Sequence, residues 1–171
     1  MKVSDIEGIL AETTEFVSLE TLLVRAAGTG RATWQDLPAS PGIYVVSFPG
    51  WETRPFSAGA GQARHAEPAD PGQLNERRKL ILAGGPTDIV YIGKAGGGSS
   101  DLRKRLSQLV RFGVGRARNH RGGEWLWQLE GIREAQIGMW TCSRDAPELL
   151  KRRLLDEFRA DHGHGPLANR I

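Results

Sequence analysis

A tyrosine, a lysine and an arginine follow one another within residues 90–106, in a pattern that brings their side chains to one place. Residues 90–92 predict a short strand, residues 93–98 are a glycine-rich loop, and the Ser-Ser-Asp cluster at 99–101 predicts the capped start of a helix. Tyr91, Lys94 and Arg105 then supply a phenol, an ammonium and a guanidinium, which are groups suited to holding a phosphate.

The apolar spacing of the predicted helix indicates where Arg105 points. Its leucines and valine recur at three- and four-residue steps and predict a buried stripe, which consists of Leu102, Leu106, Leu109 and Val110. Arg105 borders this stripe, so we expect it to face the sheet and to be a candidate phosphate ligand. The alternative is an arginine that packs its stem on the core edge and keeps its charge in water.

The charge distribution is uneven, although the net charge is only +3. Seven lysines and arginines and no acidic residue lie between Leu102 and Gly123. This pattern favours a polyanionic partner such as DNA, and a merely solvated basic face is the alternative. The candidate nucleic-acid-binding residues are Arg103, Lys104, Arg111, Arg116, Arg118, His120 and Arg121.

Length and composition set the remaining frame. A chain of 171 residues with 39% hydrophobic content suits one domain with an N-terminal extension. The absence of a long apolar run and of a signal-peptide layout predicts a soluble, cytoplasmic protein with no membrane partner. The single cysteine, Cys142, excludes an internal disulfide framework, and nothing in the sequence indicates an oligomeric state.

Periodicity and turn residues predict the other elements. Residues 4–27 are expected to be helical, and 41–48, which contain Tyr44, and 135–141 to be strands. Helices are expected near 71–82, inside a polar insertion at 50–88, and from about 145 to 161. Trp125 and Trp127 fit one face of a strand or a short helix.

Five ordered motifs resemble the GIY-YIG nuclease superfamily, including the catalytic domain of the bacterial excision-repair incision subunit. They are Gly42-Ile43-Tyr44, Tyr91-Ile92-Gly93, Lys94, the segment 102–106, and Pro166 followed by Asn169. The resemblance implies an α/β (α+β) fold with a small, three-stranded antiparallel sheet flanked by helices. It divides the chain into a helical extension, residues 1–39, and a nuclease-like domain, residues 40–171, that carries the 50–88 insertion.

The resemblance also implies an activity and site residues. The expected reaction is hydrolysis of DNA phosphodiester bonds with one divalent metal, Mg²⁺ or Mn²⁺. Tyr44 would activate or position the attacking water, with Tyr91 as its partner and Lys94 as the cation that lowers the pKa of the phenol or the water. Arg105 would clamp the scissile phosphate, and Asn169 would steady the phosphate end of the site.

Three features depart from the family pattern: the insertion between Tyr44 and Tyr91, which must fold out of the way, Leu109 where His or Tyr is usual, and, most seriously, a position on the last helix. Where the resemblance implies a metal-binding glutamate on the last helix, this chain has Lys151, whose ammonium cannot bind a cation. Glu148, one turn earlier, is the substitute metal ligand to consider. Two functions therefore compete: a metal-dependent endonuclease, and an inactive module of the same fold that binds nucleic acid or a partner. A third hypothesis is a structural interaction domain in which Trp125, Trp127 and the N-terminal helix form an oligomer interface.

Overall fold

The computed structural model describes residues 15–28, 34–57, 69–97, 99–116 and 121–170. Within them, helices and strands follow in the order β1 (Glu15–Ser18), α2 (Leu19–Ala27), β2 (Gly42–Ser47), α3 (Pro71–Ala83), β3 (Ile89–Ala95), α4 (Leu102–Gly113), β4 (Gln136–Thr141) and α5 (Pro147–His162). Three 3-10 helices complete the list: η1 (Trp51–Thr53), η2 (Arg121–Gln128) and η3 (Ile132–Glu134). The fold is α+β, as expected.

The sheet has four strands in the order β1-β4-β2-β3, and every neighbouring pair is antiparallel. The expectation of three strands is wrong because residues 15–18 form β1 rather than helix. Ser18 ends this strand, and its hydroxyl accepts a 3.1 Å hydrogen bond from the Thr21 amide. Ser18 is therefore the N-cap of α2, and the helix begins at Leu19. The remainder of the expected helix, residues 4–14, lies outside the described residues.

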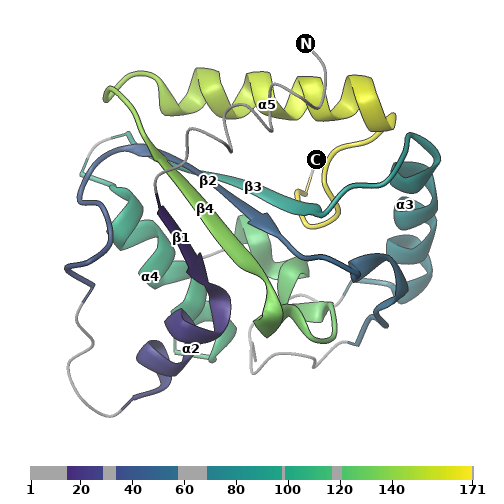
Figure 1. Cartoon of the computed structure of the whole chain (residues 1–171), viewed down its shortest axis with the longest axis horizontal. Helices are drawn as coiled ribbons and strands as arrows, with labels where there is room; N and C mark the ends of the chain where they lie inside the picture. The colour runs from purple at the N-terminus through teal and green to yellow at the C-terminus, as the bar shows by residue number, and fades with distance from the viewer. Residues whose placement is uncertain (1–14, 29–33, 58–68, 98, 117–120, 171) are drawn as a thin grey trace.

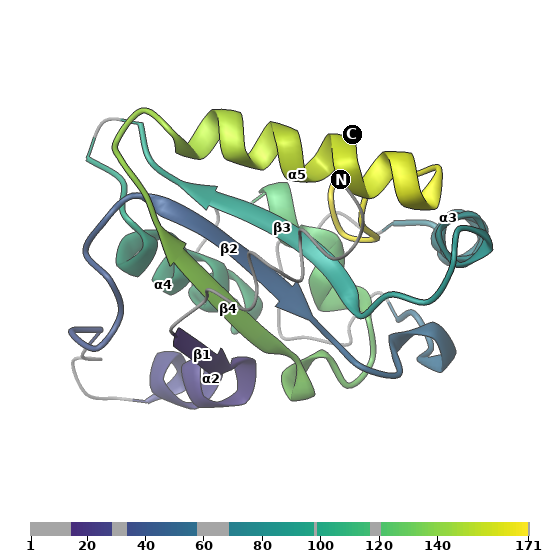
Figure 2. The same cartoon turned by 45° about the horizontal axis from the view of Figure 1, so that its top comes forward.

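Helices pack on both faces of this sheet (Figures 1 and 2). The strand register shows which side chains meet which helix. Gly42 of β2 faces α4, because a Cβ there would lie 2.7 Å from the Leu102 side chain. Lys94 of β3 points to the opposite face, where it forms an ion pair with Glu148 of α5. The sheet therefore separates α4 from α5.

The expected insertion contributes to the packed core. Its helix, α3, buries Leu74 and Ile81. Its C-cap residue, Gly84, lies so close to the end of α5 that a Cβ would be 2.5 Å from the Asp161 carbonyl oxygen and the His162 Cα. This helix thus packs beside α5 (Figure 2) rather than folding away from the domain. In the described part of the chain, no helix has the length and apolar character needed to cross a membrane.

Candidate functional site

The tyrosine pair lies on β2 and β3, at the β3 edge of the sheet. Tyr44 on β2 is directly opposite Gly93 on β3, so it shares a face with Tyr91, two residues earlier on β3. The two ring centroids are 5.9 Å apart at 49°, and both side chains are buried. Gly93 makes this approach possible, because a Cβ there would lie 2.1 Å from Tyr44 Cζ. The Gly in Tyr91-Ile92-Gly93 is therefore required by the ring of Tyr44.

Burial controls the ionisation of both phenols. It raises the pKa of Tyr44 well above the usual 10.0, the neighbouring phenol of Tyr91 raises it further, and the Arg105 guanidinium opposes the change. The pKa of Tyr91 is also raised by burial, against opposing contributions from Tyr44 and Arg105. The Tyr44 hydroxyl, although it interacts electrostatically with both neighbours, makes no hydrogen bond of ordinary geometry within the described residues. Both phenols are therefore neutral and protonated near neutral pH.

This result bears on one of the two expected roles of Lys94, the lowering of the phenol pKa. Lys94 adjoins Gly93 in the strand, so its side chain leaves the sheet on the face opposite the tyrosines. It is not among the groups that shift the pKa of either phenol, and Arg105 is the cation that acts there. The expected lowering of the phenol pKa is not found, because desolvation outweighs the nearby charge.

Helix α4 positions Arg105. The Asp101 carboxylate caps the helix by accepting a 2.7 Å hydrogen bond from the Lys104 amide. Leu102, Leu106 and Leu109 are fully buried, and this anchors the helix on the tyrosine face of the sheet. Arg105 is half-buried beside this stripe, within electrostatic reach of Tyr44, Tyr91 and Lys151.

Two lysines complete a cluster of cations near the end of β3. A Cβ on Gly96 would lie 2.5 Å from the Pro147 ring, so the strand end and the start of α5 are in close contact. Lys94 forms an ion pair with Glu148 there. Lys151, one turn further along α5, is half-buried, and its pKa is lowered by burial and by the charges of Lys94 and Arg105. We call Lys94, Arg105 and Lys151 the cation cluster.

The cation cluster does not fit the divalent metal that the resemblance implies. Mg²⁺ and Mn²⁺ prefer carboxylate and other oxygen ligands. Glu148 is the carboxylate ion-paired within the cluster, and its partner is Lys94. In the described ranges, no group of three or more His, Cys, Asp or Glu side chains is placed to hold a metal ion. One paired carboxylate beside three cations is a poor cation site and a good anion site.

Asn169 lies against the backbone of β3 rather than in the cation cluster. Its Oδ1 accepts a 2.9 Å hydrogen bond from the Ile92 amide, and its Nδ2 donates at 2.8 Å to the Ile92 carbonyl. The Ala168 amide donates at 2.9 Å to the Val90 carbonyl. The segment therefore lies along the outer edge of β3 and fixes the peptide groups that flank Tyr91.

The expected nucleic-acid-binding residues separate into different roles. Arg103 donates to the carbonyls of Gln35 and Leu37, and Arg116 donates to three carbonyls at the end of α2. Lys104 donates to the Ser99 carbonyl, and Arg111 is exposed. Arg118 and His120 lie outside the described residues, as does the side chain of Arg121. Two of the arginines therefore brace loops of the protein itself.

The tryptophan pair does not form an exposed face, so it does not supply the surface that the interaction-domain hypothesis assigns to it. Residues 4–14 of the N-terminal helix, the other part of that expected surface, lie outside the described residues. Trp127 is buried in η2, where its ring fills the space beside Gly113. Trp125 is half-buried, with the guanidinium groups of Arg77 and Arg170 each 5.5 Å from its ring centroid.

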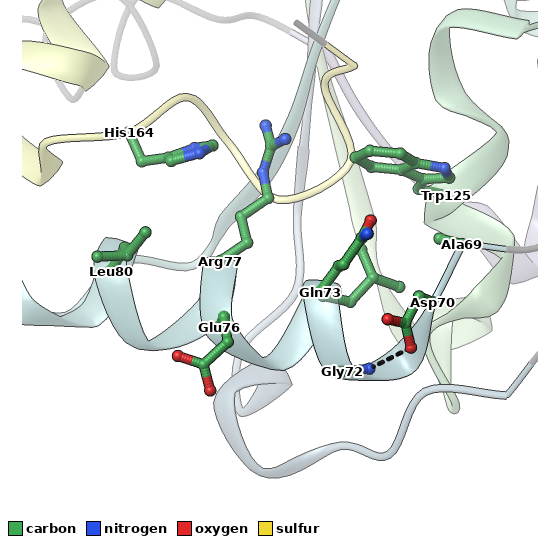
Figure 3. Close-up of a pocket in the computed structure, with 10 residues that line it drawn as sticks. Ala69, Asp70, Gly72, Gln73, Glu76, Arg77, Leu80, Trp125 and His164 are labelled. Carbon is green, nitrogen blue, oxygen red and sulfur yellow. Dashed lines mark hydrogen bonds between the residues drawn. The ribbon is translucent and has the colours of Figure 1, made fainter.

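Arg77 is an interacting residue that the sequence does not reveal. It lines a cavity of about 500 Å³ together with Gln73, Leu80, Trp125 and His164 (Figure 3). Its hydrogen-bond partners lie 88 to 92 residues further along the chain, and no local spacing predicts such a contact.

Comparisons with known proteins add no identification. No protein-family model matches this chain, and neither the curated proteins nor the solved structures contain a match to it. The function is therefore argued from the geometry of the cation cluster and the tyrosine pair.

Proposed function

We propose that this chain binds a phosphodiester group of DNA at the cation cluster, as a binding module with a GIY-YIG-like arrangement of site residues. The observation that carries the proposal is the position of Lys151, a half-buried cation within reach of Lys94 and Arg105. Like charges held together in a partly desolvated place repel one another, and an anion relieves that repulsion. A phosphate supplies the missing negative charge and several acceptor oxygens.

The separate cations suit different parts of such a ligand. The planar guanidinium of Arg105 can donate two parallel hydrogen bonds to phosphate oxygens, whereas Lys151 acts as a point charge. Lys94 is already partly neutralised by Glu148, so its contribution is the smaller one. The neutral phenols of Tyr44 and Tyr91 are donors rather than bases, which also favours binding over proton abstraction.

Endonuclease activity is the second candidate. The position of Glu148 favours it, because this carboxylate reaches the cation cluster from the first turn of α5. Cleavage would require Glu148 to leave Lys94, and Lys151 would oppose the arrival of a divalent cation. The binding function requires neither change.

A charge-reversal experiment separates the two functions. Lys151→Glu is compared with Arg152→Glu, which makes the same change in net charge at a strongly exposed position on the same helix. Binding of a labelled DNA duplex is measured at low salt, and plasmid nicking is measured with Mg²⁺ and Mn²⁺. We expect unaltered protein to bind without nicking. We expect Lys151→Glu to lose affinity by about tenfold or more, which corresponds to a contact worth about 1.4 kcal/mol, and Arg152→Glu to lose little.

Nicking by the unaltered protein would replace the binding proposal with the nuclease. Nicking by Lys151→Glu alone would support the binding proposal, because the substitution would then have converted an intact phosphate site into a metal site. Equal affinity losses in the two variants would reject the cation cluster as the binding site, because only the general charge of the protein would then matter.

A further inference from the structure

Arg77 is a half-buried cation that hydrogen-bonds to the C-terminal segment. Its Nη2 donates to the carbonyl oxygens of Pro166 at 2.8 Å, Asn169 at 2.5 Å and Gly165 at 3.5 Å. In Figure 3 the guanidinium rises from α3 into the space between His164 and Trp125. Its contacts therefore join the expected insertion to the last residues of the domain.

The charge of Arg77 is retained despite this environment. Burial, and to a lesser degree Arg159, lower its pKa to about 10, so it is still protonated near neutral pH. The Trp125 ring lies 5.5 Å from the guanidinium carbon and offers a favourable face to the cation. A charged donor that is partly removed from water forms stronger hydrogen bonds to carbonyl groups than a neutral one.

The segment that Arg77 holds is the one that positions β3. The Asn169 carbonyl accepts from Arg77, while the Asn169 side chain binds both peptide groups of Ile92. Ile92 stands between Tyr91 and Gly93, and Gly93 lies directly beneath the ring of Tyr44. The guanidinium of Arg77 is thus connected through Asn169 to Ile92, the residue next to Tyr91.

We propose that Arg77 is a positioning residue for the tyrosine pair, acting through Asn169 and the backbone of Ile92. The consequence for ligand binding rests on the proposed function, because Lys94 extends from the same strand into the cation cluster. Loss of the guanidinium leaves three carbonyls without their shared donor and frees the segment that fixes the edge of β3. Helix α3, which carries Arg77, then affects the phosphate site without contacting the phosphate.

Arg78 provides a matched control. It is the next residue of α3, its Nη2 also donates to a backbone carbonyl, that of Arg54, and its guanidinium also lies over aromatic rings, those of Phe56 and Trp51. Burial lowers its pKa as well. Its contacts, however, hold residues near η1 and not the C-terminal segment, so Arg78→Met removes a similar interaction without touching Asn169.

The test uses the fact that the chain contains two tyrosines and both are in the site. Protein labelled with ¹³C at tyrosine Cζ gives two resonances, which are assigned with Tyr44→Phe and Tyr91→Phe. We expect Arg77→Met to shift or broaden the Tyr91 and Tyr44 resonances, to speed hydrogen exchange of the Ile92 amide relative to the global unfolding rate, and to weaken DNA binding about tenfold. Arg77→Lys keeps the positive charge and three N–H donors, so it should show tyrosine resonances, Ile92 exchange and DNA affinity close to those of the unaltered protein.

Unchanged tyrosine resonances and Ile92 exchange in folded Arg77→Met would overturn the positioning role. Equal changes in Arg78→Met would do the same, because the effect would then reflect general loosening of α3. If Arg77→Met does not fold, Arg77→Gln, which keeps an N–H donor on a shorter side chain, provides the comparison. Altered resonances in a protein whose unaltered form shows no salt-sensitive DNA binding would support the positioning role and reject the proposed function.

Discussion

At the scale of single residues, burial decides what the two tyrosines can do. Their rings pack between the sheet and α4, and both side chains are buried. The hydroxyl group of Tyr44 is inaccessible to water. One partly exposed guanidinium, that of Arg105, does not compensate for this desolvation, so the phenolate form is disfavoured in each case. Both phenols are therefore neutral near neutral pH.

This ionisation predicts a pH dependence of stability. In the unfolded chain a tyrosine ionises near pH 10, whereas the folded-state pKa of Tyr44 lies well above that value. The unfolded state therefore loses protons first as the pH rises, and the free energy of unfolding should fall above about pH 10. Tyr44→Phe, which removes one of these protons, should show a shallower fall. Urea unfolding at several alkaline pH values, compared between the two proteins, measures the difference, and parallel curves would contradict the assignment.

Some site residues are predictable from the sequence and others are not. The helical spacing correctly indicates that Arg105 borders the stripe of α4 on the sheet side. Strand alternation places Lys94 and Tyr91 on opposite faces of the sheet, whereas the motif indicates that they act together. The contacts of Asn169 and Arg77 depend on tertiary packing between segments 77 and 92 residues apart, for which the local sequence contains no signal.

At the scale of elements, arginines act as braces at helix ends. Arg116, just after α4, donates to the carbonyls of Ala26, Ala27 and Gly28, at the C-terminus of α2, with distances from 2.8 to 3.0 Å. These carbonyls lack partners within their own helix, and the negative end of the helix dipole favours a cation there. The basic segment after Leu102 is therefore partly structural.

We predict that Arg116→Met mainly lowers stability, whereas Arg111→Met mainly weakens DNA binding. Arg116→Met should lower the free energy of unfolding by about 1–2 kcal/mol, since three carbonyls lose a charged donor, and should change DNA affinity little. Arg111→Met, at an exposed position on α4, should leave stability nearly unchanged and weaken binding modestly. Chemical denaturation and a binding titration on both variants test the pair. A large loss of affinity in folded Arg116→Met would return that arginine to the DNA-binding surface.

Between residues 42 and 162, most helices and strands lie close to where the sequence pattern predicts them. Strands β2 and β4 and helices α3, α4 and α5 lie where turn residues and periodicity predict them. Strand β3 is longer than predicted, because residues 93–95, which are expected to be loop, pair with residues 42–44 of β2. Residues 15–18 differ from the prediction, because they suit the start of a helix as well as a short strand. Pairing with residues 136–139 of β4, which is a tertiary interaction, decides for the strand.

At the scale of the whole molecule, few of the basic residues point to a common place. In the cation cluster, Lys94 of β3 and Arg105 of α4 both act electrostatically on Lys151 of α5, while Arg103 and Arg116 are committed to carbonyls of neighbouring loops. A polyanion would therefore contact fewer charges than a count of Lys and Arg suggests. The distribution predicts a compact contact on the DNA backbone.

Salt dependence measures the size of this contact. Each phosphate neutralised contributes roughly −0.9 to the slope of log affinity against log salt concentration. With Lys94, Arg105, Lys151 and Arg111 as the contacts, we expect a slope of about −3 to −4. Arg105→Met should reduce its magnitude by about 1, whereas Arg103→Met should not. Titrations from low to moderate salt measure the three slopes, and a slope near zero for the unaltered protein would rule out the backbone contact.

The segment along the outer edge of β3 has a consequence for solubility as well. An edge strand with free peptide groups is a template on which another chain can pair, and this leads to aggregation. Here Ala168 and Asn169 occupy the Val90 carbonyl and both peptide groups of Ile92, which blocks that approach. The contacts that hold the tyrosine strand in register therefore also protect the sheet from intermolecular pairing. Variants that release them should aggregate before they unfold.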